Sequence, residues 1–137
     1  MPENEFILPV RVYYEDTDAA GVVYYANYLK FMERARTEWL RNIGFEQDKL
    51  NKEKNILFAV RNVTIDYKKP AYFNEMLSVR SKLVDQRSAS LIFHQSIFNA
   101  DNMELCEAEI KIACLNSISM KPEPIPKTIL MEMDHVT

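Results

Sequence analysis

The feature that most limits the fold is a series of strand-like segments that follows one long amphipathic helix. In 25–43 the apolar positions recur every three or four residues, which is the period of a helix with one buried face. The later segments 57–67, 77–84, 89–98 and 105–115 instead have the composition and patterning of strands. One apolar helix face and several one-sided strands can bury each other if the sheet wraps around the helix. The pattern therefore predicts an α+β fold.

The segments around these strands predict how they pair. Short polar segments at 73–75, 85–88 and 100–102 are typical of hairpin connections, which imply antiparallel neighbours. A further strand over 6–14 contains Pro9, whose missing N–H predicts a position at the edge of the sheet. We therefore expect a five-stranded antiparallel sheet around the central helix. The tail at 127–134 is expected to form about one helical turn.

The cysteines and histidines form no recognisable disulfide or metal-binding pattern. Cys106 and Cys114 fall on one face of a single strand, and an extended chain holds them roughly 26 Å apart. A disulfide cannot span that distance, so we expect two buried free thiols. His94 and His135 have no Cys or His at ligand spacing, and no metal site is expected.

Length and composition are those of a single-domain globular protein. The 137 residues can form one core, and we treat 1–137 as one domain. A net charge of −3 gives no general attraction to nucleic acid, and no apolar run approaches the roughly 18 residues of a membrane span. The acidic start lacks a signal region, so we expect a cytoplasmic location. With only two glycines, the chain has no phosphate-binding loop, dinucleotide fingerprint or nucleophile elbow.

The segment 14–28 is the strongest candidate for chemistry. It reads YEDTDAAGVVYYANY, so Glu15, Asp16 and Asp18 precede Gly21 and the long helix. A carboxylate near a helix N-terminus can act on an electrophile whose oxygen is held by free N–H groups. From the residues alone, Asp18 suits catalysis and helix capping equally, whereas Asp16 is better explained as a structural acceptor. Gly21 is expected to provide a positive φ or a close backbone approach.

The motifs RVYYEDTD at 11–18, GVVY at 21–24, NY at 27–28, ERARTE at 33–38 and MKP at 120–122 extend over nearly the whole chain. With the order of strand, acidic loop, helix and four strands, they resemble the hotdog-fold acyl-CoA thioesterases. The likeness is to the 4-hydroxybenzoyl-CoA thioesterase family, in its Tol–Pal-associated, YbgC-type branch. The resemblance implies a single hotdog thioesterase domain that hydrolyses an acyl-CoA thioester to a free acid and coenzyme A. It implies no cofactor, because coenzyme A is part of the substrate.

The resemblance also implies roles for individual residues. Asp18 matches the catalytic carboxylate, which acts as a nucleophile on the thioester carbonyl or as a general base for water. Backbone N–H groups at 23–25 would polarise that carbonyl, and Tyr25 is the second catalytic candidate; its ring replaces a histidine that is common in the branch. Arg87 and Ser88 match positions that contact the nucleotide end of coenzyme A, and Lys68, Lys69 and Lys121 are further candidates for its phosphates. The substrate-binding candidates are Gly21, Val23, Tyr24, Tyr28, Phe58, Arg87 and Ser88.

Family members work as dimers that commonly assemble into tetramers, so the resemblance implies a homodimer within a homotetramer. The segment 56–67 would be the joining strand, and acyl carrier protein is a further candidate partner. Three alternatives stay open: a non-catalytic module that binds acyl-CoA or acyl carrier protein, a metal-dependent D-x-D phosphatase or transferase, and a hotdog hydratase. The D-x-D alternative lacks a further acidic cluster, and the hydratase alternative lacks a histidine in the loop. The sequence does not identify the acyl group.

Overall fold

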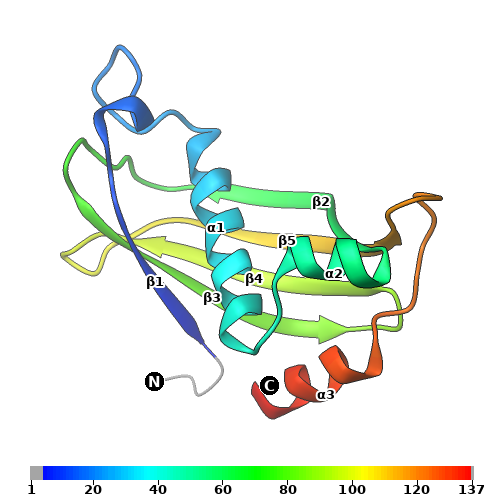
Figure 1. The fold of residues 1–137 in the computed structure, drawn as a ribbon. Coiled ribbons are helices and arrows are strands. Elements are labelled where there is room, and N and C mark those ends of the chain that lie inside the picture. Colours follow the sequence, from blue (N-terminus) through cyan, green and yellow to red (C-terminus); the bar gives the residue numbers. More distant parts are fainter. Residues whose placement is uncertain (1–4, 137) are drawn as a thin grey trace.

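The computed structural model describes residues 5–136 and has an α+β architecture (Figure 1). All five strands pair antiparallel, in the order β1-β3-β4-β5-β2, which confirms the predicted sheet. A short 3₁₀ helix at Tyr14–Asp16 lies between β1 and α1. In chain order the other elements are β1 (Phe6–Arg11), α1 (Asn27–Asn42), α2 (Gln47–Lys54), β2 (Ile56–Tyr67), β3 (Met76–Gln86), β4 (Ser90–Phe98), β5 (Glu104–Asn116) and α3 (Lys127–Val136).

The connections between strands agree with the sequence predictions except at one place. β3, β4 and β5 are consecutive neighbours, as the short polar segments between them predicted. β1 is an edge strand, as Pro9 predicted, and Pro9 lies opposite Ser78 of β3. The prediction of a hairpin at 73–75 is wrong, because β2 pairs only with β5 whereas β3 pairs with β1 and β4. The chain between β2 and β3 therefore passes from one edge strand of the sheet to the strand next to the opposite edge (Figure 1).

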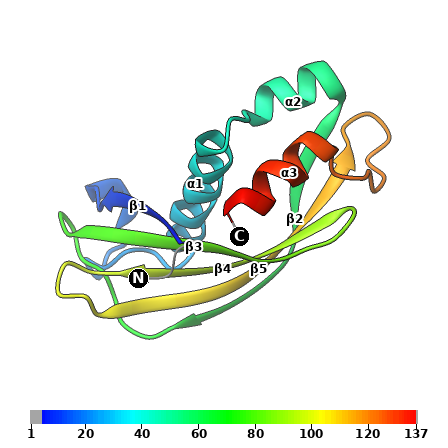
Figure 2. The same ribbon diagram turned by 90° about the horizontal axis from the view of Figure 1, so that it is seen from below.

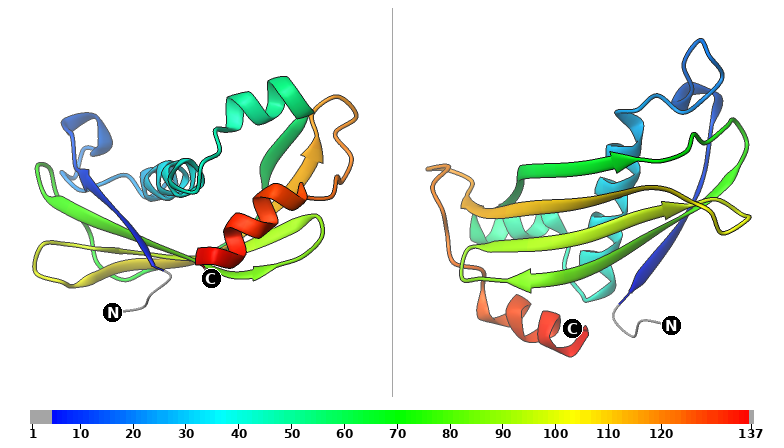
Figure 3. Two further views of the ribbon diagram at one scale, coloured as in Figure 1. Left: turned by 60° about the horizontal axis from the view of Figure 1, so that its bottom comes forward. Right: turned by 180° about the vertical axis from the view of Figure 1, so that it is seen from behind.

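α1 occupies the inner face of the curved sheet. Figure 2 shows all three helices on the same side of the strands. In Figure 3, the left view shows α1 end-on above the sheet, and the right view, from behind, shows the sheet face that α1 does not cover. Phe31, Met32 and Ala35 are completely buried between α1 and the strands. Burial of a large apolar side chain contributes about 1.5–3 kcal/mol, so this helix face is a main source of stability. Gly44 follows the helix with φ +102°, as expected for a glycine that ends a helix.

α3 is longer than the single turn that the sequence predicted. Ile125, Ile129 and Met133 recur every fourth residue, and all three are buried in the same core as α1. The Ile125 N–H donates to the Ser88 carbonyl at 2.7 Å, which ties the start of this segment to the turn between β3 and β4. Within residues 5–136, none of the helices is long and apolar enough to span a membrane.

Candidate active site

The structure separates the carboxylates of the acidic loop into two kinds. Asp16 is 7% exposed, and its two oxygens accept hydrogen bonds from the Tyr13 N–H at 2.8 Å and the Asn27 Nδ2 at 3.0 Å. Its backbone carbonyl also accepts the Tyr24 N–H at 2.9 Å. Asp16 therefore joins the loop to the first turn of α1, and its predicted role as a structural acceptor is confirmed.

Asp18, in contrast, is exposed and interacts only with its own loop. Its Oδ1 accepts the Ala20 N–H at 2.8 Å, and among the described residues no donor contacts Oδ2. Gly21 donates its N–H to the Asp18 carbonyl at 3.0 Å and has φ +82°, so a positive φ is what this position requires. Nothing lies within 4 Å of a Cβ built on Gly21, so its lack of a side chain does not serve a close contact in this chain. The N-cap of α1 is Ala26, without a side-chain cap, so the capping alternative for Asp18 is wrong.

The backbone N–H groups before α1 differ in whether they are available to a ligand. The Val23 N–H donates to the Ala71 carbonyl at 2.9 Å, and the Tyr24 N–H donates to the Asp16 carbonyl at 2.9 Å. Within residues 5–136 the Tyr25 N–H has no backbone acceptor. Of the three N–H groups expected to polarise a carbonyl, only that of Tyr25 is therefore free to do so.

A pocket of about 290 Å³ lies beside these N–H groups. Its wall consists of Val23, Tyr25, Tyr28, Tyr67, Lys68, Lys69 and Pro70. The pocket thus combines the candidates Val23, Tyr25 and Tyr28 with Lys68 and Lys69, the two phosphate-binding candidates that follow β2. Tyr67, which the sequence analysis did not single out, donates its hydroxyl hydrogen to the Tyr25 carbonyl at 2.8 Å and fixes the backbone there. The only sequence signal for Tyr67 was its place at the end of an alternating strand.

Aromatic rings continue from this pocket to the surface near Asp18. The Tyr28 and Tyr67 rings lie 5.6 Å apart, the Tyr25 and Tyr67 rings 6.2 Å apart, and the Tyr24 and Tyr25 rings 4.9 Å apart. A hydrogen bond to Tyr25 is the main cause that raises the pKa of the Tyr24 hydroxyl, and the Asp18 carboxylate raises it further. Burial raises the pKa of Tyr28, whose oxygen accepts the Ala71 N–H at 3.0 Å. These phenols are therefore protonated donors at neutral pH.

Three predicted site residues lie away from this pocket. Phe58 lines a separate cavity next to the second half of α1. Arg87 and Ser88 form the turn between β3 and β4, at the opposite end of β3 from the acidic loop (Figure 1). The 11 residues of β3 separate the two ends by about 35 Å, at about 3.3 Å per residue. One chain alone does not bring Arg87 and Asp18 to the same ligand.

The acidic loop also bears on the metal-dependent alternative. Both oxygens of Asp16 already accept hydrogen bonds, so this carboxylate is not free to complete a D-x-D metal site. No group of three or more His, Cys, Asp or Glu side chains in the described part of the chain could hold a metal ion. His94 lies on the exposed sheet surface, 3.5 Å from Glu107, as predicted for a surface histidine.

A model of the thioesterase-like superfamily matches residues 12–132, which include the acidic loop, the central helix and all of β2 to β5. The chain belongs to this superfamily. It is 48% identical over 127 residues to the acyl-CoA thioester hydrolase YbgC of Escherichia coli O6:H1, covering 93% of this chain and 94% of that protein. It is 41% identical over 136 residues to the acyl-CoA thioesterase YbgC of Haemophilus influenzae, covering 99% of both.

A solved structure supports the same assignment. The crystal structure of a probable thioesterase from Bartonella henselae matches with a TM-score of 0.84 and 33% identity, covering 89% of this chain and 99% of that one. The family and the hotdog fold that the motifs predicted are thereby confirmed.

Proposed function

We propose that this member of the thioesterase-like superfamily hydrolyses an acyl-CoA thioester to a free acid and coenzyme A. The observation that carries the proposal is the exposed Asp18 carboxylate, whose neighbour Asp16 is buried and fully engaged. A free N–H at Tyr25 and an aromatic pocket lie directly after it in the chain. The names of the YbgC relatives, which are acyl-CoA thioester hydrolases, support this substrate class.

The carboxylate can act in either of two ways. As a nucleophile, an Asp18 oxygen bonds to the thioester carbon, the C–S bond breaks, and water then hydrolyses the mixed anhydride. As a general base, Asp18 takes a proton from water while the water oxygen attacks the carbon and the C–S bond breaks. In both cases coenzyme A leaves as a thiolate that takes up a proton, and negative charge develops on the carbonyl oxygen. A donated N–H such as that of Tyr25 lowers the barrier by about 3 kcal/mol.

The remaining site candidates extend this proposal to binding. We assign Gly21, Val23, Tyr24 and Tyr28 to substrate binding, of which Val23 and Tyr28 line the pocket beside the Tyr25 N–H, and the Tyr25 ring stands where the resemblance implies a histidine that is common in the branch. β2 has an unpaired outer edge of 12 residues, which a second copy can cover by strand pairing. We therefore propose a homodimer, assembled into a tetramer, in which a second copy supplies the distant candidates Phe58, Arg87 and Ser88. Acyl carrier protein is a further proposed carrier of the acyl group.

Replacement of Asp18 by Asn tests the chemistry. Release of free coenzyme A is measured across acyl-CoAs of increasing chain length and with an aromatic acyl group. We expect kcat to fall at least about a hundredfold, because a positioned acid–base group contributes about 10²–10⁴. Glu15→Gln is the matched control, since Glu15 is an exposed carboxylate of the same loop, and its kcat should match that of the wild-type protein.

Wild-type turnover by Asp18→Asn would exclude the proposed role of Asp18. A different result would favour a non-catalytic module: the unmodified protein binds acyl-CoA but turns over none of the thioesters in the panel.

A further inference from the structure

Tyr67 connects the end of β2 to the backbone that leads into the central helix. Its hydroxyl donates to the Tyr25 carbonyl at 2.8 Å, across 42 positions of the chain. Its ring lines the pocket beside the acidic loop, with its centroid 6.2 Å from that of the Tyr25 ring and 5.6 Å from that of the Tyr28 ring. Burial raises the pKa of Tyr67, so the hydroxyl is a protonated donor at neutral pH.

The end of β2 is itself held in place by β5. Tyr67 is the last residue of β2, and the N–H groups of Lys68 and Lys69 both donate to the Leu105 carbonyl, at 2.8 and 3.0 Å. The Lys68 ammonium also forms an ion pair with Glu104, next to Leu105. Tyr67 therefore projects from a fixed strand end, which is the kind of rigid support that a positioned group requires.

The segment that Tyr67 contacts contains the N–H that is available to a substrate. The Val23 and Tyr24 N–H groups donate within the protein, whereas the Tyr25 N–H has no backbone acceptor within residues 5–136. The two peptide planes that meet at the Tyr25 Cα differ only by two torsion angles. A contact that fixes the Tyr25 carbonyl therefore also restricts the direction of the Tyr25 N–H.

We propose that Tyr67 is a positioning residue for thioester hydrolysis, an inference that rests on the proposed function. Its hydroxyl restricts the Tyr25 backbone so that the Tyr25 N–H points at the carbonyl oxygen on which negative charge develops. A donor that is aimed before the reaction needs no rearrangement during it, and therefore acts mainly on the transition state. A displacement of about 1 Å in such a site costs about a hundredfold in rate. In this role Tyr67 acts through Tyr25 and exchanges no proton with the substrate.

The substitution Tyr67→Phe tests this role, because it removes the hydroxyl and keeps the ring. We expect kcat for acyl-CoA hydrolysis to fall about ten- to a hundredfold and KM to change less than about threefold, since the lost effect belongs to the transition state. The pH profile of kcat should keep its shape, because the hydroxyl is not an acid or a base in this role. Tyr67 is 40% exposed, so water can replace the lost donor and Tm should fall by no more than about 4 °C.

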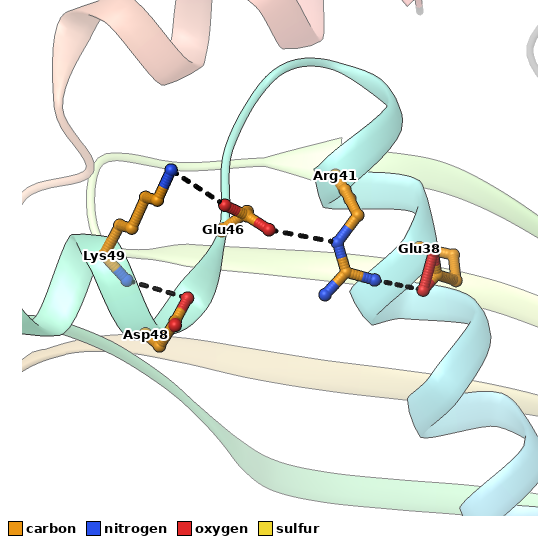
Figure 4. Close-up of polar contacts among 5 residues, drawn as sticks. All are labelled: Glu38, Arg41, Glu46, Asp48 and Lys49. Atoms are coloured by element: carbon orange, nitrogen blue, oxygen red, sulfur yellow. Dashed lines mark hydrogen bonds and ion pairs between the residues drawn. The ribbon is translucent and has the colours of Figure 1, made fainter.

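Two control variants remove polar groups elsewhere. Tyr72→Phe removes the hydroxyl of a half-exposed tyrosine outside the pocket. Glu46→Gln weakens the contacts of Glu46 with Arg41 and Lys49 at the corner between α1 and α2, which Figure 4 shows. That corner lies beyond the far end of α1, whose 16 residues span about 24 Å, and exposed ion pairs contribute little to stability. Both variants should have the kcat of the wild-type protein.

Two coenzyme A analogues test the same role without turnover. In one, a trifluoromethyl ketone replaces the thioester, and its tetrahedral hydrate resembles the transition state. In the other, a thioether of the same length has no carbonyl for the Tyr25 N–H to contact. By calorimetry, we expect Tyr67→Phe to bind the ketone about tenfold or more weaker than the wild-type protein does and to bind the thioether equally well.

The proposal is overturned if folded Tyr67→Phe keeps the wild-type kcat, or if it loses affinity for the ketone and the thioether alike. An equal loss of kcat in the control variants would have the same consequence, as would an altered pH profile, which would assign a proton transfer to the hydroxyl. Failure of the proposed function is distinguishable, because the wild-type protein itself would then hydrolyse no acyl-CoA.

Discussion

Asp16 offers the sharpest test of how the acidic loop is built. The substitution Asp16→Asn keeps the size of the side chain but replaces one acceptor oxygen by an NH₂ donor. Both oxygens of Asp16 face donors, namely the Tyr13 N–H at 2.8 Å and the Asn27 Nδ2 at 3.0 Å. While Asn27 keeps its present orientation, one hydrogen bond is lost and two donors face each other whichever way the new amide is turned.

The size of the effect follows from these two contacts. A hydrogen bond to a charged group contributes about 1.5–3 kcal/mol, and the remaining bond weakens because its acceptor becomes neutral. Tyr13 is exposed, so water can reach part of the site and the cost lies towards the lower end, at about 2 kcal/mol. For a chain of this length, about 4 °C of melting temperature corresponds to 1 kcal/mol, so we expect Tm to fall by about 8 °C.

Thermal unfolding followed by circular dichroism measures this change, and Asp18→Asn is the matched control. Asp18 is exposed and accepts one hydrogen bond within its own loop, so its substitution should lower Tm by no more than about 3 °C. Asp16→Asn should also reduce activity, because the Asp16 carbonyl and carboxylate position Tyr24 and Asn27. Equal Tm values for Asp16→Asn and the wild-type protein would refute the structural role that the contacts indicate.

Three further predictions concern the thiols and the loop glycine. Burial raises the pKa of Cys106 to about 12 and that of Cys114 to about 11. A thiolate-specific reagent should therefore modify neither cysteine in the folded protein near neutral pH, whereas it should modify both when the protein is unfolded in urea. The unfolded chain loses these protons near pH 9, so the free energy of unfolding should fall as pH rises from about 9 towards 12. Denaturant titrations across that range measure the fall, and a flat profile would contradict it. Gly21→Ala should lower stability by about 1 kcal/mol, because alanine is strained at φ +82°, and an unchanged Tm would show that the loop relaxes without cost.

Local patterns in the sequence carried much of the fold. A helix with one apolar face and a strand with alternating faces show their periods within a few residues, so α1 and β5 were predicted without tertiary information. Pro9 placed β1 at an edge because a missing N–H is a property of the residue itself. α3 was underestimated although Ile125, Ile129 and Met133 have helical spacing, because the three prolines at 122–126 suggested an extended tail.

The candidate site depended on both levels. The motif around Asp18 identified the family, because a characteristic run of residues is legible in the chain itself. Which N–H groups are free could not be predicted, since the Val23 N–H is used by Ala71, far along the chain. The pocket likewise required the end of β2 to meet the start of α1, where Tyr67 contacts Tyr25.

The sequence by itself thus determined which elements form, which family the chain belongs to and which carboxylate to examine. Only the tertiary structure decided that β2 and β3 are not neighbours and that Asp16 is committed to the fold while Asp18 is exposed. It also decided that Tyr67 meets Tyr25, 42 residues away, at the wall of the pocket. The physical reason is that periodicity and backbone chemistry are local. Strand order, burial and hydrogen-bond partners instead depend on contacts between distant residues that form only when the chain is folded.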